Sequence, residues 1–208
     1  MSWLDLFERL GGLPAEAWLV PPVVIIAGIV AIGVMLHRAR LRRYRAIAAR
    51  TGLVVKASIV NASQVRGVYS GRPLVMSIAS ARPPGFFRKT WTRVFVEVRN
   101  PRFVALRLRR RDVIDRLLRL GNAPVGDAEF DRRFLVLSRD SGYVMMIFSD
   151  RTLRELFFQA DIRRVHLVGS SLEVFYRREV RDPEHAARLF DATVRLAEAV
   201  DMLESGRY

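Results

Sequence analysis

Cysteine is absent from the 208-residue sequence, and lysine is nearly absent. The lack of cysteine excludes disulfide bonds, thiol catalysis and zinc or iron–sulfur sites built on cysteine ligands. Of the 35 basic residues, 33 are arginine and two are lysine, and with 21 acidic residues the formal net charge is +14. Acidic residues are also missing between Glu16 and Glu97, whereas both signs are mixed from Asn100 onward. The half of the chain nearer its N-terminus is therefore strongly basic.

The sequence motifs of well-known catalytic sites are absent as well. There is no glycine-rich dinucleotide or phosphate loop, no HExxH zinc motif and no GxSxG nucleophile elbow. His166 and His185 have no partner at the spacing of metal ligands, and His37 is interpreted as lying among lipid headgroups rather than ligating a haem or chlorophyll metal. We therefore expect a non-catalytic protein with no cofactor, no bound metal and no small-molecule substrate.

One stretch of the chain, residues 17–36, carries no charged side chain. As a helix its twenty residues would span about 30 Å, the thickness of the hydrocarbon core of a bilayer. It is too long and too uniformly apolar for a typical buried helix of a soluble domain. It also lacks the basic start and the small-residue cleavage site of a signal peptide. The stretch predicts a transmembrane helix that begins or kinks at Pro21 and Pro22.

Arginines cluster directly after this stretch and predict its orientation. Five of them follow it closely, whereas only Arg9 precedes it. Short flanks rich in basic residues stay in the cytoplasm, so we expect a bacterial inner-membrane protein with its N-terminus outside and its C-terminal domain in the cytoplasm. The same side chains are expected to contact anionic headgroups, and they are Arg38, Arg40, Arg42, Arg43 and Arg45.

Small residues along the apolar stretch could let another helix approach closely. They are Ala27, Gly28, Ala31 and Gly33, and their alternative explanation is the ordinary abundance of alanine and glycine in membrane spans. The expected organisation is an amphipathic segment (1–16), the transmembrane helix (17–36), a basic juxtamembrane extension of that helix (37–51) and a soluble domain (52–208). Gly52 is the expected C-cap of the extension.

The soluble region shows the period-two pattern of half-buried strands. We expect hairpins that turn at Ser70-Gly71 and at Gly169-Ser170, and an antiparallel pair formed by residues 92–99 and 103–110. Helices are expected over 111–120, 150–159 and 183–205, while 143–148 fits either a strand or a short helix. The prediction is an α+β fold, a mainly antiparallel sheet covered by helices.

A loop rich in proline and glycine, residues 80–89, carries two aromatic side chains beside two basic ones. Basic and aromatic residues at a loop tip can insert into a membrane interface. This makes the loop a possible interface element, and the alternative is that both rings pack into the core. The four residues are Phe86, Phe87, Arg88 and Lys89.

A short run further along, G-D-x-x-F-D-x-x-F-x-V, is formed by Gly126, Asp127, Phe130, Asp131, Phe134 and Val136. It resembles a motif of uncharacterised bacterial membrane-anchored proteins that have one N-terminal span and a cytoplasmic α+β domain. The resemblance implies no activity. From the residues alone, we expect both phenylalanines to be core anchors and both aspartates to accept hydrogen bonds from local backbone amides.

The net positive charge is compatible with several classes of binding partner. An arginine-rich surface can bind anionic lipid headgroups, an acidic protein or, without sequence preference, nucleic acid, and it can also simply be solvated. We expect lipid headgroups and other membrane-protein subunits as partners, and no nucleic acid. The leading hypothesis is a non-catalytic accessory subunit of a larger membrane complex, respiratory or photosynthetic. The alternatives are a free-standing tethered domain that binds anionic lipid or an acidic protein, and an enzyme of unrecognised type.

Overall fold

A computed structural model describes residues 20–58, 63–81, 89–112 and 123–203. The chain divides into two compact units, residues 1–42 and residues 43–208. The expected amphipathic segment (1–16) lies outside the described residues, as do the start of the predicted span and residues 113–120 of the helix predicted over 111–120.

The first unit contains most of α2 (Val20–Thr51), a helix of 32 residues. By length and composition it can cross a membrane. Between Val23 and Leu36, ten large apolar side chains are each at least 45% exposed, an arrangement that water does not favour. Pro21 and Pro22 fall in the first turn of the described helix, where their missing N–H groups break no helical hydrogen bond. This exposed apolar helix indicates a membrane anchor.

The last turns of α2 belong to the second unit, where Tyr44, Ile47 and Ala48 are buried in the core. The helix ends as expected: Gly52 adopts φ +71° and the Leu53 N–H donates to the Ala48 carbonyl (3.1 Å). This is the hydrogen bond of a Schellman cap.

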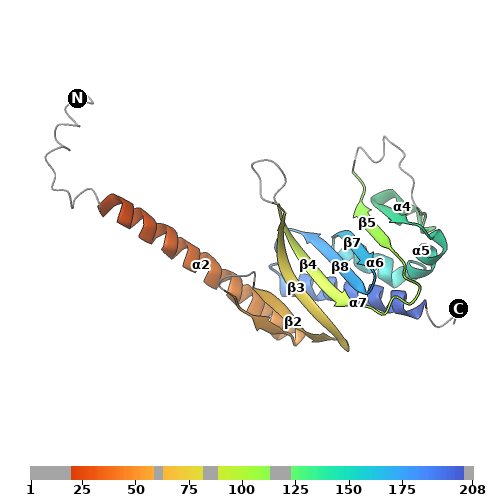
Figure 1. Cartoon of the computed structure of the whole chain (residues 1–208), viewed down its shortest axis with the longest axis horizontal. Coiled ribbons are helices and arrows are strands. Elements are labelled where there is room, and N and C mark those ends of the chain that lie inside the picture. Colours follow the sequence, from red (N-terminus) through yellow and green to blue (C-terminus); the bar gives the residue numbers. More distant parts are fainter. Residues whose placement is uncertain (1–19, 59–62, 82–88, 113–122, 204–208) are drawn as a thin grey trace, which may run out of the picture. The chain divides into compact units, whose positions relative to one another are not determined.

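The second unit is built on one eight-stranded sheet in the order β1-β2-β3-β4-β8-β7-β5-β6, and every adjacent pair is antiparallel. Its helices gather on one face of this sheet (Figure 1). The α+β class and the antiparallel sheet are as predicted. The strands are β1 (Val54–Lys56), β2 (Gln64–Tyr69), β3 (Arg72–Ala81), β4 (Lys89–Glu97), β5 (Leu106–Arg110), β6 (Phe134–Ser138), β7 (Ile162–Val168) and β8 (Ser171–Arg177).

Both predicted hairpins are present. Tyr69 pairs with Arg72 across Ser70 (φ +49°) and Gly71 (φ +78°), the two positive values that a type I′ turn requires. Val168 pairs with Ser171 across the second hairpin turn.

The expected pairing of residues 92–99 with 103–110 is wrong. β4 pairs with β3 and β8, whereas β5 pairs with β6 and β7. The cause is Asn100, which is buried, adopts φ +41° and donates from Nδ2 to the carbonyls of Val104 (3.0 Å) and Gly169 (2.7 Å). These bonds tie the turn to the β7–β8 hairpin, so the chain passes that hairpin before β5 begins.

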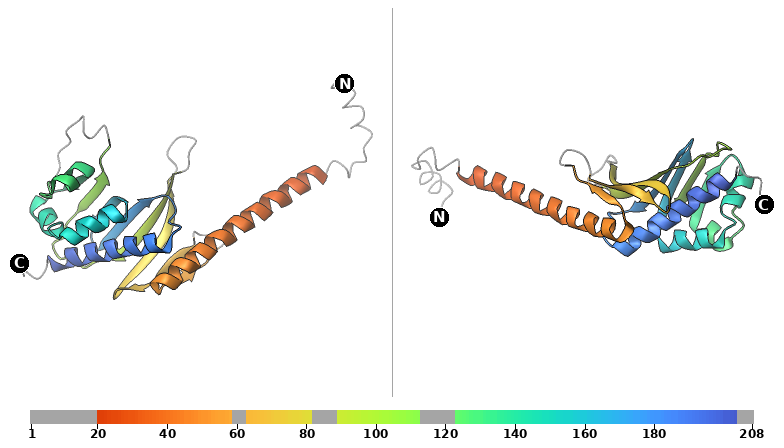
Figure 2. Two further views of the ribbon diagram at one scale, coloured as in Figure 1. Left: turned by 180° about the vertical axis from the view of Figure 1, so that it is seen from behind. Right: turned by 90° about the horizontal axis from the view of Figure 1, so that it is seen from below.

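The helices pack on the face of the sheet where the strands bury their apolar residues (Figure 2). They are α4 (Ala128–Arg133), α5 (Ser141–Ile147), α6 (Arg151–Gln159) and α7 (Pro183–Met202), so residues 143–147 are helical. The longest of these, α7, begins at the cap Asp182 with Pro183 in its first turn, and its apolar side, including Leu189, Phe190 and Leu196, is buried.

The motif residues behave as the physical argument expects. Phe130 and Phe134 are buried, and their ring centroids are 4.6 Å apart. Asp127 accepts hydrogen bonds from the amides of α4, and Asp131 accepts one from the Val125 N–H (2.9 Å). The motif is thus a structural element of the core and its adjoining turn.

Candidate anion-binding site

The second face of the sheet carries a mixture of arginine and aromatic side chains. Because successive side chains of a strand point to opposite faces, the register assigns this face directly. One row across the strands runs Ser77, Arg93, Phe175, Arg164, Arg109, Leu135, and its two end residues are buried. The next row runs Val75, Phe95, Glu173, His166, Arg107, Leu137. We call this the open face, because the described helices pack on the other side. Its remaining members include Val54, Arg66, Trp91, Glu97, Val168 and Arg177.

Positive charge exceeds negative charge on the open face. Six arginines lie there, Arg66, Arg93, Arg107, Arg109, Arg164 and Arg177, against the two acids Glu97 and Glu173. Arg93 donates to Glu173 (3.2 Å). His166 packs on Phe175 with 5.2 Å between ring centroids, and burial, reinforced by the charge of Arg107, lowers the pKa of His166. His166 is therefore mainly neutral at pH 7, and the positive charge of the face comes from its arginines and from Lys56, which lies on the same side of β1 as Val54.

The arginines converge at one end of the sheet. In an antiparallel sheet, the starts of β4 and β7 lie beside the ends of β5 and β8. Arginines at the ends of β5 and β8 and at the start of β7, together with Trp91 near the start of β4, surround a pocket of about 180 Å³, which we call the five-arginine pocket. It is lined by Trp91, Arg109, Arg110, Asp112, Arg163, Arg164 and Arg177.

Two carboxylates partly neutralise this pocket. Asp161, just before β7, accepts a hydrogen bond from Arg110 Nη1 on one oxygen (2.8 Å) and from Arg163 Nη2 on the other (3.1 Å). Asp112 lies 3.7 Å from Arg109 Nη1. Arg164 and Arg177 make no ion pair within the described residues, and the Arg164 guanidinium lies over the Trp91 ring at 4.7 Å.

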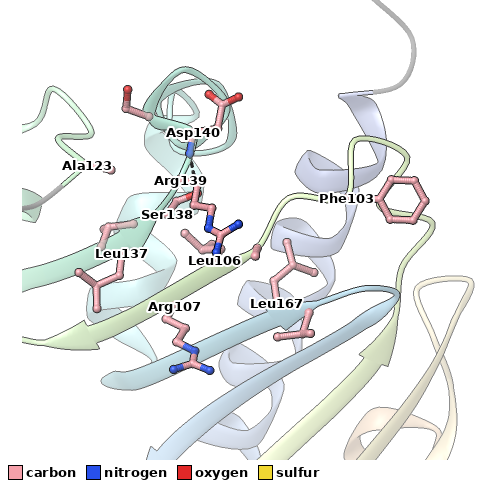
Figure 3. Close-up of a pocket in the computed structure, with 13 residues that line it drawn as sticks. Phe103, Leu106, Arg107, Ala123, Leu137, Ser138, Arg139, Asp140 and Leu167 are labelled. Atoms are coloured by element: carbon pink, nitrogen blue, oxygen red, sulfur yellow. Dashed lines mark hydrogen bonds between the residues drawn. The ribbon is translucent and has the colours of Figure 1, made fainter.

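A wider groove of about 930 Å³ lies at the opposite end of β5 and β7, beside the end of β6 (Figure 3). It is lined in part by three exposed apolar side chains, Phe103, Leu137 and Val168, of which Phe103 is 83% exposed. The carboxylate of Asp140, which also lines the groove, accepts from the amides of Gly142 and Tyr143 as the N-cap of α5. The groove thus offers apolar contact beside Arg107. The Asp140 carboxylate that lines it is already engaged as the N-cap of α5.

No three histidine, aspartate or glutamate side chains among the described residues are grouped so that they could hold a metal ion. Two carboxylates with lowered pKa values on the helix side have structural partners. Backbone hydrogen bonding, chiefly from Phe130, lowers the pKa of Asp127, and the Arg50 guanidinium lowers the pKa of Glu184. These contacts stabilise helix starts.

The residues proposed from the sequence do not gather in one place. The small residues Ala27, Gly28, Ala31 and Gly33 are exposed on α2, and a Cβ added to either glycine would meet no atom within 4 Å. Of the basic cluster, Arg38, Arg40 and Arg42 belong to the first unit, and Arg43 and Arg45 to the second. Phe86, Phe87 and Arg88 lie outside the described residues, and Lys89 is the first residue of β4.

The five-arginine pocket was not predicted from the sequence. Its residues are spread from position 91 to position 177, and only the sheet order brings them together. A weak signal exists, because the pairs Arg109-Arg110 and Arg163-Arg164 and the single Arg177 all stand at strand ends.

Fold and face together define a class of protein: an α+β domain with a cationic open sheet face, joined to a long apolar helix. No protein-family model matches the chain, and no curated protein shows significant sequence similarity to it. Among solved structures, it is similar to the crystal structure of the mycobacterial trehalose monomycolate transport factor A, TtfA. The identity is 13%, the TM-score is 0.42, and the match covers 78% of this chain and 93% of that chain. A likeness this distant assigns neither family nor function.

Proposed function

We propose that the protein is a non-catalytic, single-pass accessory subunit of a larger complex in the bacterial inner membrane. In this proposal its N-terminus is outside, and its cytoplasmic domain docks through the open face onto an acidic surface of a partner subunit. The observation that carries the proposal is the open face itself: a sheet face that the described helices leave uncovered, with six arginines against two acids.

The partner's chemistry follows from that face. Arginine binds carboxylates through paired N–H groups, and its planar guanidinium also packs on aromatic rings, so arginine and aromatic side chains are enriched at protein interfaces. At the far end of the face, the exposed Phe103, Leu137 and Val168 provide apolar contact. The expected partner therefore presents carboxylates along its surface and one apolar side chain that enters the groove.

The test uses the full chain in its native membrane. A photoreactive side chain at position 168, on the open face, should crosslink to a membrane subunit, whereas the same group at position 155, exposed on α6, should not. Arg66→Glu combined with Arg107→Glu should abolish the crosslink, because two positive charges become negative, a net change of four units, opposite the partner's carboxylates. The matched control, Arg132→Glu with Arg181→Glu, makes the same charge change at exposed arginines outside that face and should retain it.

Two results would reject the proposal. Recovery of only the monomer after extraction in mild detergent would reject membership of a complex. An undiminished crosslink in the Arg66→Glu, Arg107→Glu variant would reject docking through the open face.

A second candidate function, a tethered domain that binds anionic lipid, is favoured by one observation: the basic residues of α2 directly follow its exposed apolar part. Each arginine near anionic headgroups contributes about 1 kcal/mol, and salt screens this attraction. In nanodiscs, the open-face arginine side chains should then be protected from a guanidinium-modifying reagent by anionic lipid at low salt and not at high salt. Equal modification in neutral and anionic nanodiscs would exclude this function.

A further inference from the structure

Among the described residues, the five-arginine pocket carries more positive than negative charge. Its five guanidinium groups face two carboxylates, Asp112 and Asp161, which leaves an excess of three positive charges among the described residues. Like charges gathered at one point destabilise the fold unless an anion neutralises them.

The register shows how two of these arginines are placed. Arg109 and Arg164 stand directly opposite each other on the neighbouring strands β5 and β7, and both line the pocket. Like charges directly opposite across an antiparallel pair are destabilising. Such a pair at the edge of a cavity is the arrangement expected where a bound anion sits between two guanidinium groups.

The pocket also holds its cations in fixed directions. Trp91 supports the flat face of the Arg164 guanidinium at 4.7 Å, and Asp161 fixes one N–H edge each of Arg110 and Arg163. Each guanidinium has five N–H donors, so these three arginines keep others for a ligand. The Arg163 Nε–H is buried and has no hydrogen-bond partner within the described residues.

Size and charge select the ligand. At about 180 Å³ the pocket is smaller than the roughly 300–1,000 Å³ of pockets that enclose whole cofactors or drug-sized molecules. A phosphate monoester carries about −1.5 to −2 charges at pH 7 and three acceptor oxygens, which balances the excess better than a single carboxylate. Arginine matches phosphate geometry with parallel N–H groups.

From this geometry we propose that the five-arginine pocket is a binding site for a single phosphate monoester group. The group is either a free phosphate or phosphomonoester in solution, or the headgroup of phosphatidate in the membrane. The site does not depend on docking of the domain onto a partner.

The test uses the full chain with Trp3→Phe and Trp18→Phe, reconstituted in phosphatidylcholine nanodiscs. The chain has three tryptophans, so Trp91 becomes the only tryptophan fluorophore, and it lies in the pocket. Inorganic phosphate should change its fluorescence saturably, with a Kd at or below about 1 mM. If the natural source is phosphatidate, nanodiscs containing this lipid should give the change even where inorganic phosphate does not.

Arg164→Gln should weaken binding about tenfold to a hundredfold, the effect of losing a charged hydrogen bond. The same variant should raise the melting temperature without ligand, because it removes the repulsion between Arg164 and Arg109. A misfolded variant cannot combine weaker binding with a higher melting temperature. The matched control Arg66→Gln, on the open face but outside the pocket, should leave phosphate binding unchanged.

Three outcomes would overturn the proposal. They are no saturable response to either inorganic phosphate or phosphatidate, an equal loss of binding in Arg66→Gln and Arg164→Gln, or a lower melting temperature in Arg164→Gln with binding retained. None of these measurements involves a partner subunit, so a failure here is distinct from a failure of the docking proposal.

Discussion

Membrane anchoring by α2 can be tested by placing charge in its apolar part. Ile26→Arg and Ile29→Arg replace two exposed apolar side chains of this helix. On insertion scales, Leu, Ile and Val each favour the membrane by about 0.3–0.6 kcal/mol, and arginine at the helix centre opposes it by about 2.5–3.5 kcal/mol. The nine exposed Ile, Leu and Val residues between Val23 and Leu36 therefore supply about 3–5 kcal/mol.

One substitution changes the insertion free energy by about 3–4 kcal/mol and brings it near zero, and both together change it by about 6–8 kcal/mol. The single variants should thus be recovered in part from membranes washed with alkaline carbonate. The double variant should be found in the wash. The control, Ile26→Ala with Ile29→Ala, keeps the helix uncharged and should stay in the membrane pellet.

If the double arginine variant remained in the pellet as fully as the control, α2 would not be what holds the protein to the membrane. The substituted arginines could not account for such a result by reaching the membrane surface, because both lie well inside the apolar part. They are at least six residues from Val20 and seven from Leu36.

Three further predictions concern the folded domain. Asn100→Ala removes three side-chain hydrogen bonds, two buried ones with Val104 and a partly buried one to the Gly169 carbonyl, and should lower the free energy of unfolding in urea by about 3 kcal/mol. Gln159→Ala on the exposed surface should change this free energy little. Arg154→Met leaves the half-buried Asp127 without its 2.9 Å partner and should lower that free energy by about 1–3 kcal/mol, and no loss would contradict the contact. Burial lowers the pKa values of His166 and His185, so their contribution to the free energy of unfolding should be fully present above about pH 6.5 and should be lost as the pH falls below that value. The double variant His166→Gln, His185→Gln should remove this pH dependence.

Local features of the fold were predictable because they depend on residues close in sequence. Asp182 caps α7 by accepting from the amides two and three residues ahead, and Ser70-Gly71 forms a two-residue turn. The order of the strands was not predictable in this way. β5 was assigned to β4 because the two are neighbours in sequence, but Asn100 makes its deciding hydrogen bond to Gly169, 69 residues away. Residues 143–147 were ambiguous because a short apolar run fits a strand and a helix equally.

The candidate site depended on the same long-range information. Each strand alone shows only that arginine alternates with apolar residues, which a solvated surface also produces. The open face emerges when the register aligns Arg93, Arg164 and Arg109 in one row. The pocket emerges when four strand ends meet. The sequence therefore predicted a basic protein and a basic region beside the membrane, but not where in the domain the charge gathers.

The charge of the domain is segregated in space although it is mixed in sequence. From Asn100 onward, acids and arginines alternate along the chain, which suggested a balanced distal half. In the folded domain many of those acids serve the helices: Asp127 pairs with Arg154, Asp150 with Arg195, and Glu184 with Arg50.

The acids assigned to the helices cannot neutralise the open face, where only Glu97 and Glu173 remain beside six arginines. The near absence of lysine is consistent with this arrangement. An ammonium group has no flat face to stack on Trp91, and it cannot donate the two parallel N–H hydrogen bonds that a planar guanidinium offers an anion. It follows that Arg164→Lys should keep the charge of the open face but lose phosphate binding in the pocket. A purely solvated basic surface would not distinguish the two cations.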